Sequence, residues 1–184
     1  MKVAIHQPNF LPWWPFFEKM ARADVFVVLR HCQFEKNNFQ NRFQYRNSWM
    51  TMSTYNGLDP IFEKKYVDPG KDWRRIKEKL KDKKKILEKF DEFIGESLWE
   101  TNYKIIISAA ELLGIKTKIV LDKPTELKST ERLIEICKNL GATKYISGSG
   151  AKKYLDCSAF ESSSIEVEFQ ELNSKDKIHI LDKL

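Results

Sequence analysis

A histidine near the start of the chain is the residue whose type and place best fit chemistry. His6 follows the β-branched run 3–5 and precedes a loop that three prolines stiffen. An imidazole held between a buried strand and a rigid loop can donate a hydrogen bond or exchange a proton near neutral pH. We therefore predict that His6 is catalytic. The alternative is a structural hydrogen-bonding role at the end of a strand.

Two further segments supply groups that suit a polar or anionic ligand. Residues 30–46 mix amides with aromatic side chains and include Asn41 and Arg42. A guanidinium there could bind a carboxylate or phosphate through two hydrogen bonds, while amides hydrogen-bond to hydroxyl groups. The sequence Ser-Gly-Ser-Gly at 147–150 leaves the backbone free to approach a ligand, although it lacks the phosphate-loop pattern. The alternatives are a surface loop whose aromatic side chains fill the core, and a plain tight loop.

The elements that would position these residues form two strand–helix–strand units. The predicted elements are a strand over 3–5, a helix over 16–23, strands over 25–29 and 115–121, a helix from 129 or 130 to 140, and strands over 145–147 and 165–170. Strand–helix–strand units place their strands in parallel, with the carboxyl ends on one edge. The pattern predicts an α/β three-layer sandwich with a mainly parallel, Rossmann-like sheet.

The middle of the chain adds a strand and two helices to this scaffold. We expect a strand over 49–54 and a long amphipathic helix over 71–94, because its apolar residues recur on one helical stripe. Ser97 and Glu100 have the spacing of a capping box, and the helix that they begin should stop at Gly114. Without an internal repeat or a linker, residues 1–184 form a single predicted domain.

The predicted strand ends locate the site. In an open parallel sheet, ligands bind beyond the carboxyl ends of the strands. The polar residues at those ends are His6 and Gln7, Arg30 and His31, Asp122 and Lys123, and 147–150. We expect them to gather on one rim, and we expect His6 and the Asn41–Arg42 pair to line a common cavity.

Composition and charge limit the classes of protein to which the chain can belong. With 42% hydrophobic and 32% charged residues in 184, the chain is a globular one rather than a fibrous or disordered one. The formal charge is +6, and segment 71–89 holds ten Lys or Arg against four Asp or Glu. A solvated helix face is the ordinary reading of such a segment. The alternative is a non-catalytic binding module for an acidic partner, but no motif for specific nucleic-acid binding is present.

The spacing of the cysteines and histidines indicates the redox compartment of the protein and whether a metal site is expected. The three cysteines are odd in number and show no C-x-x-C spacing, which predicts free thiols in a reducing compartment. Cys32 beside Arg30 is an alternative nucleophile. The three histidines are far apart, so we expect no metal and no cofactor. With no long apolar run and no signal segment, we expect a cytoplasmic protein without membrane insertion. The oligomeric state is not indicated.

Several motifs together resemble one known family. The run His6–Trp13 (HQPNFLPW) and the later segments 19–20, 23–27, 33–36 and 40–42 are similar to the amino-terminal signature of the WbqC-like family. Segments 145–148, 169–170 and 180–182 resemble the carboxyl half of that family. The resemblance extends over nearly the whole chain. One departure is Arg30–His31, where the family usually has acidic residues.

The resemblance implies a role in bacterial surface-polysaccharide synthesis, such as O-antigen or capsule. The expected reaction is transfer of an acyl or amino-acyl group to a nucleotide-linked sugar, from an activated acyl or carrier-protein donor. On this interpretation His6 is the acid/base or hydrogen-bond donor and Arg42 is the anion clamp. The other expected substrate-binding residues are Gln7, Asn9, Gln33, Lys36, Asn41, Ser147 and Gly148.

A second enzymatic hypothesis is a nucleotidyltransferase-like protein. Those folds also begin with a strand, a histidine-containing loop, a helix and a second strand, and the imidazole faces a triphosphate. Asn9 stands where a second histidine would be, and no K-M-S-K-S type loop is present. This signature is therefore incomplete.

Overall fold

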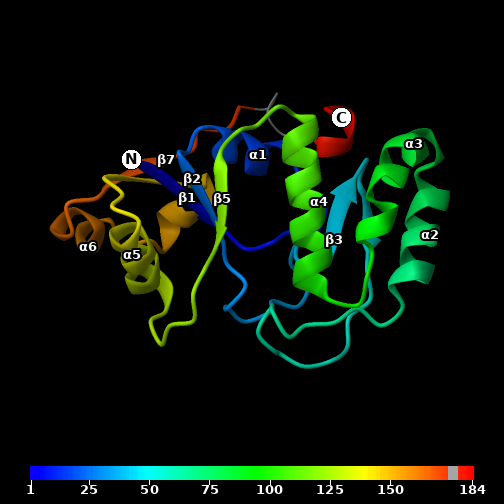
Figure 1. Ribbon diagram of the computed structural model, residues 1–184, viewed down its shortest axis with the longest axis horizontal. Helices are drawn as coiled ribbons and strands as arrows, with labels where there is room; N and C mark the ends of the chain where they lie inside the picture. Colours follow the sequence, from blue (N-terminus) through cyan, green and yellow to red (C-terminus); the bar gives the residue numbers. More distant parts are fainter. Residues whose placement is uncertain (174–177) are drawn as a thin grey trace.

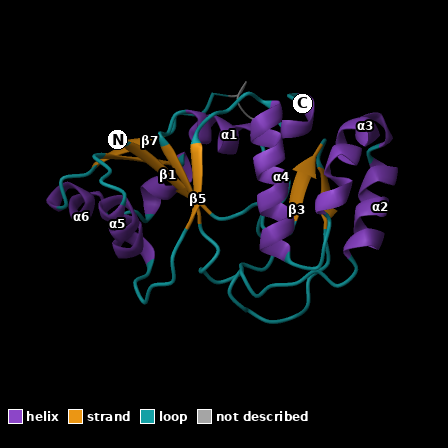
Figure 2. Ribbon diagram, in the orientation of Figure 1, coloured by secondary structure: helices purple, strands orange, loops and turns teal. Residues whose placement is uncertain are grey.

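Five parallel strands form the main sheet of the computed structural model, which describes residues 1–173 and 178–184 (Figures 1 and 2). In spatial order the strands are β5 (Lys118–Leu121), β2 (Val25–Val28), β1 (Lys2–His6), β6 (Lys144–Ser147) and β7 (Glu166–Phe169). Along the chain, β2 and β5 are added on one side of β1, and β6 and β7 are then added on the other side. This is the doubly wound, Rossmann-like order, as the sequence predicts.

The two neighbours of β1 define where the strand order reverses. Val3 pairs with Val25 of β2 on one side and with Tyr145 of β6 on the other. The helical connections that leave β1 and β6 cross opposite faces of the sheet, so they diverge at this point. The carboxyl ends of β1 and β6 therefore flank the crevice where this class of sheet binds ligands.

Alternation along the strands produces the three layers. Val3 and Ile5 of β1 pack in a cluster with the helices α5 (Ser129–Asn139) and α6 (Cys157–Ser162). Ala4, between them, belongs to the cluster that contains α1 (Trp14–Ala21) and α4 (Leu98–Leu112). Successive strand residues point to opposite faces, so the sheet is buried on both sides. The three-layer α/β prediction is confirmed.

A small antiparallel sheet, β3 (Arg42–Tyr45) and β4 (Ser48–Thr51), lies apart from the main sheet. Arg46 and Asn47 both have positive φ, 46° and 63°, which is the conformation of a tight two-residue hairpin turn. The strand expected over 49–54 is thus shorter, and β3 was not expected. Buried and more exposed residues do alternate along β3, with Phe43 and Tyr45 buried, but the surrounding amides obscure this pattern in the sequence.

The prediction of one long helix over 71–94 is wrong. The segment forms α2 (Pro69–Lys79), the 3₁₀ helix η1 (Lys81–Lys83), α3 (Lys84–Leu87) and the 3₁₀ helix η2 (Glu88–Phe93). The helix breaks at Leu80, whose φ and ψ are −112° and 51°. Residues 81–85 are all charged and four are lysines, so no apolar face holds a continuous helix there. The predicted apolar stripe is nevertheless buried on both sides of the break.

Three of the helix ends that the sequence predicts are confirmed, whereas the expected cap by Ser129 or Thr130 is not formed. The Ser97 hydroxyl accepts a hydrogen bond from the backbone N–H of Glu100 at the start of α4. Gly114 and Gly141 follow the ends of α4 and α5 with φ of 70° and 67°. This left-handed conformation favours glycine after a helix.

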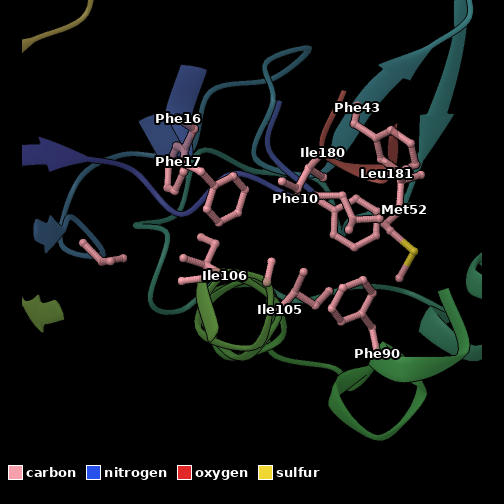
Figure 3. Close-up of a cluster of buried hydrophobic side chains, with 14 of the residues drawn as sticks. Phe10, Phe16, Phe17, Phe43, Met52, Phe90, Ile105, Ile106, Ile180 and Leu181 are labelled. Carbon is pink, nitrogen blue, oxygen red and sulfur yellow. The ribbon is translucent and has the colours of Figure 1, made fainter. Parts of the chain in front are cut away.

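One apolar cluster joins the main sheet to the small one (Figure 3). Helix α4 stands between them, with Ile105 and Ile106 buried. Phe17 of α1 and Phe43 of β3 belong to the same cluster. Removal of a central side chain should therefore destabilise the packing of both sheets.

Replacing Ile106 by alanine will lower the free energy of unfolding by about 2–5 kcal/mol, because a fully buried side chain leaves a cavity. Chemical denaturation of the purified protein measures this loss. Leu112→Ala on the same helix is the control, since that side chain is 45% exposed and its loss should cost roughly 0.5 kcal/mol or less. Equal losses in the two variants would contradict the core assignment.

Candidate functional site

A cavity of about 310 Å³ opens at the carboxyl ends of β1 and β6; we call it the switch-point cavity. Five residues predicted from the sequence line it, namely His6, Gln7, Asn9, Ser147 and Gly148. Residues 6 and 147 are far apart in the chain, and they meet because β1 and β6 are neighbours. The cavity therefore lies where the topology places a ligand site.

His6 is held by a hydrogen bond and a ring contact. Its Nδ1 lies 3.0 Å from the carbonyl oxygen of Gln7, and its ring meets the Phe16 ring at 4.9 Å between centroids. A carbonyl oxygen only accepts, so Nδ1 carries the proton and Nε2 is left as an acceptor. Burial and, to a smaller extent, the charge of Lys19 lower the pKa of His6 to about 3. The hydrogen bond to Gln7 acts in the opposite direction. At neutral pH the imidazole is thus a neutral acceptor, not the donor we expected.

Lys19 is a wall residue that we did not single out from the sequence. Its side chain lies on the buried face of α1 and lines the switch-point cavity with only 3% of its surface exposed. Nζ donates to the backbone carbonyl of Ile5 at 3.2 Å. Burial lowers the pKa of this amine to about 7. The available signal was a lysine three residues after Phe16, on the apolar face of a short helix.

The Ser147 hydroxyl completes the polar wall beside β6. Ser147 is 1% exposed and its Oγ makes no hydrogen bond within the described residues. The Tyr145 hydroxyl interacts with it but lies outside hydrogen-bonding geometry. A ligand donor or acceptor could satisfy this buried oxygen.

The space around the glycines after Ser147 is open. A Cβ placed on Gly148 or Gly150 would meet nothing within 4 Å, so neither is required by a close approach of the protein's own atoms. The following helix is η3 (Ser149–Lys153), a 3₁₀ helix of 5 residues. So short a helix has little of the dipole that would hold an anion.

Asn41 and Arg42 line a different cavity of about 450 Å³, which we call the hairpin cavity because β3 and β4 form part of its wall. The Arg42 guanidinium lies 4.1 Å from the centre of the Trp49 ring and donates to the Asn37 carbonyl. Asn41 donates to the Met52 carbonyl at 2.7 Å. The expectation that His6 and the Asn41–Arg42 pair share one cavity is therefore wrong.

A third cavity, of about 570 Å³, lies between the other two, and we call it the bridging cavity. It shares Gln7 with the switch-point cavity and shares Lys36 with the hairpin cavity. Gln33 also lines it. All nine residues predicted from the sequence thus line a series of three cavities in which neighbours share wall residues.

The rim beyond β2 and β5 is closed by an ion network. The Asp122 carboxylate, with no side-chain exposure, pairs with Arg132 and lies 3.1 Å from Nδ1 of His31. It also accepts the backbone N–H groups of Arg30 and His31. Asp122, His31 and Arg30 line none of the three cavities, so only part of the predicted rim forms a site.

Cys32 does not have the properties of an activated nucleophile. It is a free thiol in the wall of the bridging cavity, and burial raises its pKa to about 11. A thiol with a raised pKa is a poor nucleophile near neutral pH. Cys137 and Cys157 are also free.

The basic segment 71–89 is partly neutralised by ion pairs within the protein. Four of its basic residues, Arg75, Lys77, Lys83 and Lys84, pair with carboxylates. In Figure 1 the helices α2 and α3 lie at the opposite end of the molecule from α5 and α6. This arrangement is typical of a solvated helical face.

Metal-ligand clusters and membrane-spanning helices are both absent from the described residues. Across 1–173 and 178–184, no group of three His, Cys, Asp or Glu side chains has the spacing of a metal site. Within the same ranges, no helix combines the length and apolar character needed to cross a bilayer.

The fold and the cavities define an α/β protein with a Rossmann-like sheet and a polar cavity at the point where the strand order reverses. The sequence matches the model of the WbqC-like protein family over residues 7–177, and the chain belongs to this family. It is also similar to an uncharacterized protein of Mycobacterium tuberculosis, 28% identical over 187 residues, which cover 90% of this chain and 80% of the relative. No solved structure matches it.

Proposed function

We propose that the protein is a cytoplasmic transferase of bacterial surface-polysaccharide synthesis, which moves an acyl or amino-acyl group onto a nucleotide-linked sugar. The observation that supports this most is the series of three cavities lined by all nine predicted residues. Family membership supports the polysaccharide context. A series of cavities fits an extended ligand better than a compact one.

The distribution of charge along the series fits the two halves of such a ligand. Lys36 and Arg42 bring positive charge to the hairpin cavity, where a diphosphate would lie. The switch-point cavity has mostly uncharged donors and acceptors, including Gln7, Asn9 and Ser147, which suit sugar hydroxyl groups. The acyl acceptor would therefore be presented beside His6.

The hairpin cavity also has unused hydrogen-bonding groups. Oδ1 of Asn41 and Nε of Arg42 are buried and have no partner among the described residues. Tyr55, 56% exposed, lines the same cavity and offers a ring face to a base. These groups support placing the nucleotide end of the ligand here.

The direct test is to incubate the protein with sugar nucleotides that carry a free amine or hydroxyl and with activated acyl or amino-acyl donors. The donors should include coenzyme A thioesters and acyl carrier proteins. Mass spectrometry should detect an acylated sugar nucleotide. Binding of sugar nucleotides without product across the donor set, or no binding at all, would contradict the proposed function.

Replacing Arg42 by alanine will raise KM for the sugar nucleotide about 10- to 100-fold and leave kcat within about twofold. The reason is that a charge-assisted hydrogen bond to a phosphate, about 1.5–3 kcal/mol, would be lost far from the reacting atoms. Steady-state kinetics and calorimetric binding measure the change. Arg46→Ala is the control, because Arg46 follows β3 but pairs with Asp82 outside the three cavities. A similar KM in the two variants would contradict the role of Arg42.

A further inference from the structure

A buried amine without a carboxylate partner stands in the wall of the switch-point cavity. Lys19 is 3% exposed, and Nζ donates to the Ile5 carbonyl at 3.2 Å. No Asp or Glu side chain among the described residues lies within ion-pair distance of it. Burying an unpaired ammonium is costly, so such a lysine is neutral more readily than an exposed one.

The groups around Lys19 keep it free of negative charge. His6 on β1 is neutral, and Tyr145 on β6 lines the same cavity with a pKa raised by burial. Glu18, the neighbour on α1, is already engaged by Arg22 and by the amide of Gln170. No carboxylate among the described residues therefore stabilises an ammonium here, so the amine loses its proton at a lower pH than an exposed lysine.

We propose that Lys19 is the catalytic general base of the switch-point cavity. This inference rests on the proposed function. The acceptor's nitrogen or oxygen forms a bond to the acyl carbon while its proton passes to the lone pair of Nζ. The bond from the acyl carbon to the donor breaks, and the leaving group departs with the electron pair. The leaving group then recovers the proton from the Lys19 ammonium.

The geometry divides the roles of Lys19 and His6. Nδ1–H of His6 is committed to the Gln7 carbonyl, so Nε2 can accept a hydrogen bond and orient the acceptor. The pKa of Lys19, about 7, lies near the operating pH, where a general base is most effective, and the pKa of His6, about 3, does not. The base in this wall is therefore the lysine.

The first test is kinetic. Lys19→Met keeps most of the side-chain volume and removes the amine, and kcat should fall about 10³-fold. The wild-type kcat/KM should rise with pH through about 7, as the amine loses its proton. Activity of Lys19→Ala should be partly restored by small primary amines, more strongly by the more basic ones. Lys138→Met, on the exposed side of α5, is the control with unchanged turnover.

The second test measures the pH dependence of the reactivity of the Lys19 amine and needs no substrate. Trace acetylation with isotopically labelled acetic anhydride, followed by peptide mass spectrometry, gives the pH at which each lysine becomes reactive. Lys19 should reach half of its maximal reactivity near pH 7, well below the pH at which exposed lysines ordinarily do so. The reagent is small enough for a cavity of about 310 Å³.

The outcomes separate this inference from the proposed function. Acyl transfer that persists at wild-type rate in Lys19→Met, or a reactivity midpoint of Lys19 near 10, would overturn the role of Lys19 and leave the proposed function standing. Absence of transfer by the wild-type protein would overturn the proposed function and the base role with it. Loss of transfer in Lys19→Met, rescue by amines and a midpoint near 7 would together support the inference.

Discussion

Replacing Arg132 by alanine will lower the free energy of unfolding by about 3–5 kcal/mol. The variant leaves the carboxylate of Asp122 buried without its guanidinium partner, in a place where the carboxylate has no exposed surface. His31 and two backbone N–H groups still contact it, but none brings a fixed positive charge. Urea denaturation followed by circular dichroism measures the loss.

A double variant gives this stability prediction a sharper test. Arg132→Ala with Asp122→Asn removes both charges, so it should be less destabilised than Arg132→Ala alone. Arg46→Ala is the control for an exposed pair, because Arg46 and Asp82 are 63% and 49% exposed and solvent screens their attraction, so the loss should be small. Equal effects of Arg132→Ala and Arg46→Ala would show that the network is not a buried one.

Replacing His6 by alanine will lower kcat about 100-fold, because the variant loses the acceptor that orients the substrate beside the reacting atoms. Sugar-nucleotide binding should change little, since the cationic residues lie in the hairpin cavity. His6→Gln, which keeps an acceptor atom, should retain more activity. Steady-state kinetics of the two variants separates these effects.

The pH dependence adds a check on the state of His6. Its pKa of about 3 means that the imidazole stays neutral from pH 5 to 8, so it should add no transition near 6.5 to the activity profile. The contribution of His6 to stability should be lost as the pH falls below about 6.5, because below the unfolded-state pKa the unfolded chain binds a proton that the folded imidazole resists. An activity step near 6.5 that disappears in His6→Gln would contradict this assignment.

Local patterns in the sequence were sufficient for much of the scaffold. The β-branched runs at β1 and β2 are continuous and apolar because those strands are buried on both faces. The stops at Gly114 and Gly141 follow from a backbone conformation that glycine adopts without strain. The placement of His6 at the end of β1 follows from the same local reasoning, and so does the cap at Ser97.

Contacts between distant segments account for what could not be predicted. The hairpin β3–β4 depends on the shape of the core that it covers, which no short window of sequence contains. The separation of His6 from Arg42 into two cavities depends on the path of the long connection between β2 and β5.

Lys19 is the plainest case of this limit. Its spacing from Phe16 places it on the apolar face of a short helix, but a lysine on a helix is usually solvated. It is buried because α1 packs against the sheet with this side chain turned toward Ile5, which removes water that the free helix would have kept. Residue types and local periodicity thus account for the strands of the main sheet and for the helix ends at Gly114 and Gly141. The shape of the cavities and the charge state of Lys19 arise only on packing, because desolvation is a property of the assembled fold.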